Sequence, residues 1–184
     1  MGAGGIHDAA EAIGRALTEL NIDYAIAGAI ALGEHGFQRL TVDVDVLIRR
    51  EDLARFKARW LGRGYVEVRP GGKAVRDTTN NVRIDFLIVG DYPGDGLPKP
   101  VAFPEPAQAS VQGLKYRVLT LPHLIELKLA SGITAPHRLH DLADVLRLTR
   151  HASLPRDFAL RLDPYVRAKY DELWVLAQHP DDDY

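Results

Sequence analysis

Residues 39–48 read Arg-Leu-Thr-Val-Asp-Val-Asp-Val-Leu-Ile, and this stretch decides the fold. Its β-branched and apolar residues predict a strand over residues 42–48. Side chains alternate between the two faces of a strand, so Asp43 and Asp45 point to one face and the valines point to the other. Two like charges side by side repel each other unless a cation lies between them. A divalent cation that prefers oxygen ligands, Mg²⁺ above all, is the economical explanation.

The composition excludes several classes of protein and of site. The chain has 184 residues, 46% hydrophobic and 26% charged, which suits one globular domain or one domain with a small appendage. Its formal net charge of −2 does not indicate nucleic-acid binding, and the absence of cysteine leaves carboxylates and histidines for any metal site. No apolar run approaches the roughly 20 residues of a membrane span, and no signal-peptide segment is recognisable. We therefore expect a cytoplasmic protein without a membrane partner.

The spacing of apolar residues predicts an α/β half followed by a helical half. The expected strands are at residues 24–27, 42–48, 65–68, 75–78, 82–89, 101–103 and 116–119. The expected helices are at residues 6–20, 29–36, 53–62, 122–131, 138–149, 155–162 and 165–178.

The predicted boundary between the halves lies near residue 119. We expect an α/β core over residues 1–119 and a helical region over residues 120–184, which ends in a solvated acidic tail at residues 181–183. Residues 91–112 are rich in proline, glycine and alanine, so we expect a long loop there around one short strand. The fold class is α/β (α+β), with a mixed sheet.

Two further positions suggest chemistry near the aspartate pair. Gly28 lies between a predicted strand and a predicted helix, where free backbone N–H groups suit a phosphate, although plain turn chemistry is the commoner use of such a glycine. Asp85 interrupts an apolar strand on the same face as Arg83, so it is an ion-pair or edge-strand charge, or a third carboxylate. Three carboxylates on neighbouring strands can hold two Mg²⁺ ions, which stabilise both oxygens of a displacement at phosphorus.

These residues resemble the nucleotidyltransferase superfamily related to DNA polymerase beta. The motif elements are, in chain order, Gly28-Ala29-x-Ala31-Leu32, Arg39-x-Thr41-x-Asp43-x-Asp45 and Asp85 within a strand. More closely, the chain resembles the AbiEii-type toxin-like nucleotidyltransferases of prokaryotes over about residues 20–150. The resemblance implies a mixed-sheet nucleotidyltransferase core followed by a C-terminal helical bundle.

The resemblance also implies roles for individual residues. Asp43, Asp45 and Asp85 would be the catalytic and metal-binding carboxylates. The residues implied at the nucleotide are Gly28, Ala29, Arg39, Thr41, Lys128 and Asp141. Arg39 and Thr41 have structural alternatives, as an anchor of the loop before the strand and as a residue that sets the strand start.

In the helical half, Lys128 lies in a segment that resembles the lysine helix of the family, and Asp141 and Asp144 lie in one that resembles its Lys-Asp-x-x-Asp helix. The apolar neighbours of Lys128 predict partial burial, so the lysine needs an anionic partner, and the resemblance implies the nucleotide triphosphate. The alternatives are a solvated charge for Lys128 and, for Asp144, a helix charge or an ion pair with Arg147.

Two positions depart from the family pattern. Ala29 stands where the family usually has glycine or serine, so the hydroxyl that would help to hold a phosphate is missing. His140 stands where the family has a lysine before the second-helix aspartate. Neither departure removes a metal carboxylate, so neither by itself implies an inactive protein.

The functional hypothesis is Mg²⁺-dependent transfer of a nucleoside monophosphate from a nucleoside triphosphate to an acceptor hydroxyl, with two metal ions. The resemblance implies RNA, notably tRNA, or a protein as acceptor, and a toxin that has an antitoxin partner. The alternative is a non-catalytic nucleotide-sensing or partner-binding module on the same fold. A glycosyltransferase with an Asp-x-Asp motif is a weaker third hypothesis, because that fold normally needs a longer chain.

Overall fold

The computed structural model describes residues 3–179, which divide into two compact units. Unit 1 holds the residues up to Glu34, Gln38–Gly90 and Phe103–Thr120, and unit 2 holds His35–Phe37, Asp91–Ala102 and the residues from Leu121 onward. The predicted acidic tail at residues 181–183 lies outside the described residues. Within residues 3–179, the helices lack the length and apolar composition that a membrane span requires.

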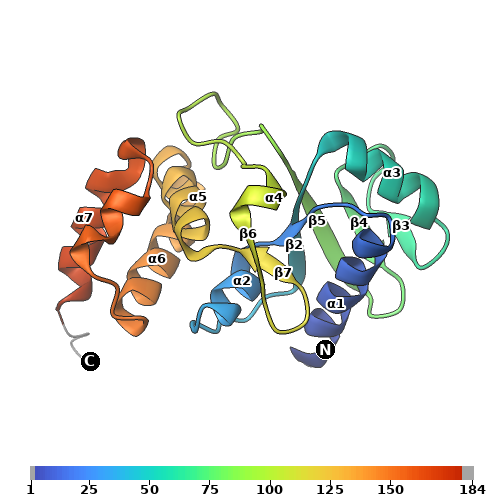
Figure 1. The fold of residues 1–184 in the computed structure, drawn as a ribbon, viewed down its shortest axis with the longest axis horizontal. Helices are drawn as coiled ribbons and strands as arrows, with labels where there is room; N and C mark the ends of the chain where they lie inside the picture. The colour runs from blue at the N-terminus through green and yellow to red at the C-terminus, as the bar shows by residue number, and fades with distance from the viewer. Residues whose placement is uncertain (1–2, 180–184) are drawn as a thin grey trace. The chain divides into compact units, whose positions relative to one another are not determined.

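Unit 1 is built on a seven-stranded mixed sheet with the strand order β3-β4-β5-β2-β1-β7-β6 (Figure 1). β2 runs parallel to β5 and β1 runs parallel to β7, whereas the other neighbours are antiparallel. The strands are β1 (Ala25–Ile26), β2 (Asp43–Ile48), β3 (Tyr65–Glu67), β4 (Ala74–Asp77), β5 (Val82–Ile88), β6 (Ser110–Gln112) and β7 (Arg117–Leu119).

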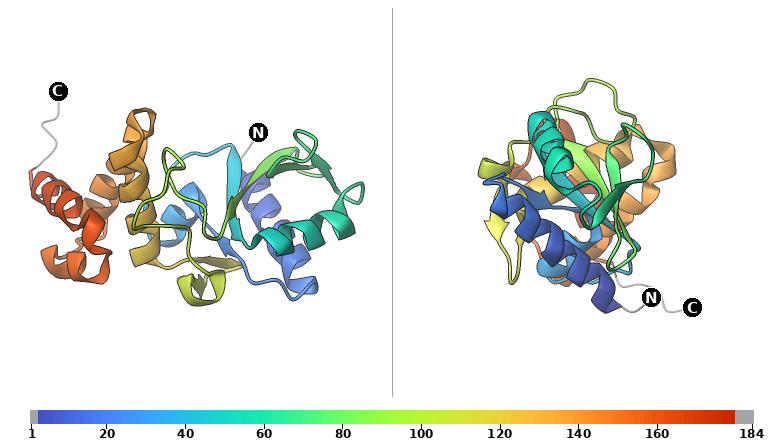
Figure 2. Two further views of the ribbon diagram at one scale, coloured as in Figure 1. Left: turned by 90° about the horizontal axis from the view of Figure 1, so that it is seen from above. Right: turned by 90° about the vertical axis from the view of Figure 1, so that its right-hand side faces the viewer.

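One face of this sheet is covered by two helices that lie beside each other (Figure 2). The helices of unit 1 are α1 (Ala3–Glu19), α2 (Gly28–Glu34), α3 (Arg50–Trp60) and α4 (Pro106–Ala109). α1 contacts α3, β2 and β5, and Phe56 of α3 packs on Phe86 of β5 with 5.5 Å between ring centroids. Because β5 alternates, Ile84 and Phe86 are buried under these helices and Asp85 points to the opposite face.

Unit 2 is helical. It contains α5 (Leu121–Thr134), the 3₁₀ turn η1 (Pro136–Arg138), α6 (Leu139–His151), the 3₁₀ helix η2 (Arg156–Arg161) and α7 (Pro164–Ala177). α5, α6 and α7 pack against one another. α5 and α6 approach closely at Gly132, where an added Cβ would lie 2.5 Å from Cγ of Leu142. This close approach allows polar side chains of the two helices to meet.

The segment over residues 91–112 differs from its prediction. The predicted strand at residues 101–103 is wrong: the chain there has no regular secondary structure and lies outside the sheet, and Pro104 follows with no N–H to donate. The same segment instead contains α4 and the edge strand β6. The sequence of β6 has no alternation of apolar residues that would predict a strand, and its Val111 is 44% exposed. The helix predicted at residues 155–162 is the 3₁₀ helix η2.

Candidate active site

The register of β2 and β5 places the three predicted carboxylates on one face of the sheet. Asp45 lies directly opposite Asp85, and Asp43 lies opposite Arg83. Residues in register on parallel neighbours point to the same face, and the strands lie about 4.8 Å apart. We call Asp43, Asp45 and Asp85 the acidic face.

The acidic face is open to solvent at the beginning of β2 and β5. The side chain of Asp85 is 28% exposed and that of Arg83 is 48% exposed, and Asp43 and Asp45 are half-buried. Farther along β2 the same face closes, because Leu47 is fully buried. A ligand can therefore reach the carboxylates from one end of the two parallel strands.

Gly28 lies against the acidic face because β1 runs antiparallel to β2. Ile26 pairs with Val46, and the backbone N–H of Ala27 donates to the carbonyl of Asp45 at 2.9 Å. The next residue, Gly28, has a φ of +59°, and an added Cβ would lie 2.1 Å from Oδ2 of Asp45. A side chain here would therefore strain the backbone and displace the Asp45 carboxylate.

The other nucleotide-binding residues predicted in unit 1 have different surroundings. Thr41 donates from its hydroxyl to Oδ1 of Asp43 at 2.7 Å, as expected for a residue that fixes the start of β2. Arg39 is exposed in the preceding loop, and Ala29 is buried in the first turn of the seven-residue α2. Contact between these residues and a nucleotide stays a prediction.

Arg83 forms a two-pronged ion pair with Asp85. Its Nε donates to Oδ2 at 2.8 Å and to Oδ1 at 3.0 Å, and its second terminal nitrogen donates to Oδ1 at 2.7 Å. The hydrogen bonds and charge of Asp85, with the charges of Asp43 and Asp45, raise the pKa of Arg83 above its usual value. Asp85 thus forms the ion pair that was one of its interpretations, and its role as a third metal-binding carboxylate stays a prediction. The alternation of β5 indicated that the two side chains share a face, but not that they bond.

The metal-binding prediction has support from the donor set. Three carboxylates suit Mg²⁺, which prefers oxygen ligands, and the missing side chain at Gly28 makes room for the Asp45 carboxylate itself. Within residues 3–179, however, no three acidic, histidine or cysteine side chains converge as a ready-made metal site. Both oxygens of Asp85 face Arg83 instead. The residues therefore fit the ion in type and register, while Asp85 is bonded to Arg83.

Unit 2 contains a second charged group, formed by Lys128, Asp141 and Asp144, which we call the lysine cluster. Nζ of Lys128 donates to Oδ1 of Asp141 at 2.9 Å and to Oδ2 of Asp144 at 2.8 Å. The hydroxyl of Ser131 donates to Oδ2 of Asp141 at 2.8 Å. Lys128, Asp141 and Asp144 are 7%, 6% and 1% exposed.

The lysine cluster supplies the anionic partner that the burial of Lys128 requires. Burial alone raises the pKa of Asp141, but the charge and hydrogen bond of Lys128, the hydrogen bond of Ser131 and the charge of Arg138 outweigh it, so the pKa lies below its usual value. Asp144 pairs with Lys128, as an alternative to the ion pair considered with Arg147. Direct nucleotide contact of Lys128 and Asp141 stays a prediction.

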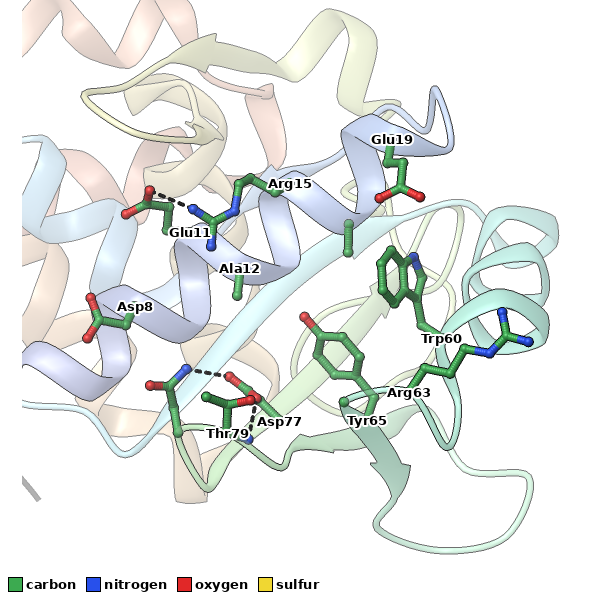
Figure 3. Close-up of a pocket in the computed structure, with 13 residues that line it drawn as sticks. Asp8, Glu11, Ala12, Arg15, Glu19, Trp60, Arg63, Tyr65, Asp77 and Thr79 are labelled. Atoms are coloured by element: carbon green, nitrogen blue, oxygen red, sulfur yellow. Dashed lines mark hydrogen bonds and ion pairs between the residues drawn. The ribbon is translucent and has the colours of Figure 1, made fainter.

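A cavity of about 650 Å³ opens on the other face of unit 1 (Figure 3). Trp60 and Tyr65 line it, and so does Asp77, which pairs with Val82 on the face that α1 and α3 cover. Asp77 accepts a hydrogen bond from the backbone N–H of Thr79 at 2.9 Å, and burial and the charge of Asp77 raise the pKa of Tyr65 to about 12. Neither the acidic face nor the lysine cluster lines this cavity.

No family model matches the sequence, and no curated protein is similar to it. Several solved structures are similar to the model. ANT(2'')-Ia, in complex with adenylyl-2''-tobramycin, is 14% identical with a TM-score of 0.54, over 86% of this chain and 92% of its own. JHP933 from Helicobacter pylori is 16% identical with a TM-score of 0.52, over 97% and 92%.

TM1012 from Thermotoga maritima, whose name gives it as a candidate nucleotidyltransferase, is 13% identical with a TM-score of 0.50, over 80% of this chain and 96% of its own. At such identities the similarity is one of fold. The seven-stranded mixed sheet and the helical C-terminal part match the folds of these proteins over most of their length. The chain therefore has the fold of nucleotidyltransferases.

Proposed function

We propose that the protein is a Mg²⁺-dependent nucleotidyltransferase that moves a nucleoside monophosphate from a nucleoside triphosphate to an acceptor hydroxyl and releases pyrophosphate. The observation that carries the proposal is the register of β2 and β5, which places Asp45 opposite Asp85 and keeps Asp43 on the same open face. Three carboxylates that share one open face suit a divalent cation that prefers oxygen ligands, so this arrangement favours a binding role over a structural one.

Each carboxylate has a distinct part in this proposal. Asp43 and Asp45 would hold both metal ions, and Asp85 would hold one ion and accept the proton of the acceptor hydroxyl. Bound ions supply charge neutralisation for the attacking and leaving oxygens. Thr41 orients Asp43 through its hydrogen bond, and the missing side chain of Gly28 makes room for the Asp45 carboxylate. Such a reaction depends mainly on positioning and charge.

The acceptor is the open part of the proposal. The resemblance to AbiEii-type proteins favours RNA, notably tRNA, or a protein, together with a toxin role and an antitoxin partner. The structure of ANT(2'')-Ia holds adenylyl-2''-tobramycin, so a small molecule with several hydroxyl groups belongs in the same test. All three acceptor classes present the hydroxyl that the proposed reaction needs.

A labelling experiment tests the proposed function. The protein is incubated with Mg²⁺ and each α-³²P-labelled nucleoside triphosphate, together with total tRNA, lysate protein or tobramycin. We expect label on one acceptor class with the wild type and with Asp8→Asn, which changes an exposed carboxylate of α1 outside the acidic face. Asp45→Asn should transfer no label.

Two results would contradict the proposal. Transfer by Asp45→Asn at the wild-type rate would remove the acidic face from the reaction. Mg²⁺-dependent nucleotide binding without transfer to any acceptor would favour the alternative, a nucleotide-sensing module on this fold.

A further inference from the structure

We propose that Arg83 is a positioning residue that occupies the cation position at Asp85 in the metal-free protein, and that a divalent metal ion binds to the acidic face by displacing it. The inference rests on the proposed function and concerns how its metal site is assembled. Arg83 thus holds Asp85 away from Asp45 until the metal arrives.

The geometry of the ion pair makes guanidinium and metal alternatives. Both carboxylate oxygens of Asp85 accept hydrogen bonds from Arg83, at 2.7 to 3.0 Å. A planar guanidinium that holds both oxygens engages the lone pairs that a metal ion needs. In agreement, the described residues 3–179 contain no converged group of three metal-ligating side chains, although the register places Asp45 beside Asp85.

The exposure of the pair makes its exchange feasible. The side chain of Arg83 is 48% exposed and that of Asp85 is 28% exposed. Ion pairs in contact with solvent are weak, because water screens the attraction and the free side chains gain entropy. A doubly charged ion with three carboxylates nearby can therefore replace a single guanidinium. A buried pair such as Lys128–Asp144 could not be exchanged so easily.

The displaced guanidinium of Arg83 stays on the same face of the sheet, where it can bind an anion. Arg83 lies opposite Asp43 on one side and opposite Arg76 of β4 on the other. Arg76 donates to the backbone carbonyl and to Oδ1 of Asn81, both at 3.2 Å, so it does not compete for Asp85. Once Asp85 turns away, Arg83 is a charged donor for an anion beside the metal, and the triphosphate of the proposed reaction is such an anion. Metal and triphosphate binding should therefore support each other through Arg83.

The test is a titration with Mn²⁺ alone, followed through the electron paramagnetic resonance of the free ion, without nucleotide. Arg83→Gln should bind Mn²⁺ about tenfold more tightly than the wild type, equivalent to about 1.4 kcal/mol. The matched control is Arg76→Gln, which removes the same charge from the same face but leaves the Arg83–Asp85 pair intact. Its affinity should stay within about twofold of the wild type, because solvent and salt screen more distant charges.

A second readout covers folding and the conservative variant. In EDTA, Arg83→Gln should melt below Arg76→Gln, because Asp85 then loses the guanidinium bonded to it, and Mn²⁺ should raise its melting temperature more than that of the wild type. Arg83→Lys keeps the charge without the fork and should bind Mn²⁺ with intermediate affinity.

Three results would overturn the inference. Equal tightening in Arg83→Gln and Arg76→Gln would reduce the effect to net charge. Weaker Mn²⁺ binding in Arg83→Gln would mean that Arg83 supports the metal site. If neither the wild type nor Arg83→Gln bound Mn²⁺, Arg83 and a metal ion would not compete for Asp85. Failure of the proposed function is distinguishable, because it would show as absent label transfer while the Mn²⁺ titration still separates the two variants.

Discussion

The acidic face and the lysine cluster both bring aspartates together, yet they differ in the burial of the carboxylates and of the cation that pairs with them. On the acidic face the carboxylates are half-exposed, and the guanidinium of Arg83, itself exposed, bonds to Asp85. In the lysine cluster the charges are buried, and Lys128 lies between two carboxylates with normal hydrogen bonds to each. A buried charge network stabilises its own fold only when every member is paired, whereas an open group of like charges is suited to bind a ligand.

The largest effect on stability should come from breaking the lysine cluster. Lys128→Met leaves Asp141 and Asp144 buried beside each other, which should lower the free energy of unfolding by about 3–5 kcal/mol in urea titrations. The matched variant is Lys128→Met with Asp141→Asn and Asp144→Asn, which removes all three charges and should recover at least half of that loss. A loss under about 1 kcal/mol in the single variant would mean that the pairing contributes little.

The same Lys128→Met variant tests the predicted nucleotide contact. If Lys128 only stabilises unit 2, the folded wild type and the folded Lys128→Met variant should bind triphosphate with the same affinity. The affinities are measured by calorimetry with Mg²⁺. A loss of triphosphate affinity with an unchanged nucleoside affinity would show that Lys128 reaches the phosphates, as the resemblance implies.

A smaller effect is expected where Gly28 contacts Asp45. Gly28→Ala forces a left-handed conformation on alanine and displaces the Asp45 carboxylate, so it should cost about 1–2 kcal/mol of stability and weaken Mn²⁺ binding. Gly62→Ala is the control, because Gly62 has a φ of +75° with open space around its Cβ position. It should lose stability without losing Mn²⁺ affinity. Equal Mn²⁺ affinities in the two variants would mean that Gly28 does not affect metal binding at the acidic face.

The smallest effect should be the pH dependence of the lysine cluster. The pKa of Asp141 is lower in the folded protein than its usual value, so its stabilising contribution is complete above the usual pKa and is lost as the pH falls through the lower, folded value. Below about pH 4, the urea midpoint of the wild type should therefore fall more steeply than that of Asp141→Asn, which cannot titrate there. Parallel midpoints between pH 5 and pH 3 would contradict this assignment.

The sequence predicted the strands of the acidic face well, because a β-branched run with period-two carboxylates has few other interpretations. The alternation along β2 and β5 predicted which side chains share a face, and the structure agrees at Asp45 and Asp85. The close contact of Gly28 with Asp45 depends on the antiparallel register of β1 and β2, which a two-residue strand does not encode by itself.

The partners of charged residues were harder to predict than their positions. The apolar neighbours of Lys128 predict an anionic partner for it. Its partners Asp141 and Asp144 are 13 and 16 residues away in the sequence, and the packing of α5 on α6 brings them together. The predicted strand at residues 101–103 failed because apolar side chains alone cannot distinguish a sheet strand from an irregular segment with a buried residue such as Val101.

The most direct test compares the rate of label transfer between a variant of the acidic face and a variant of the lysine cluster, at a temperature where every variant is folded. Asp45→Asn should lose transfer by at least about 1,000-fold, or about 4 kcal/mol of transition-state stabilisation, without a lower melting temperature in EDTA. The triple variant Lys128→Met, Asp141→Asn and Asp144→Asn should melt lower but keep transfer within about tenfold. Transfer that survives in Asp45→Asn would contradict the central role of the acidic face, and transfer that disappears in the folded triple variant would show that the reaction also needs the lysine cluster.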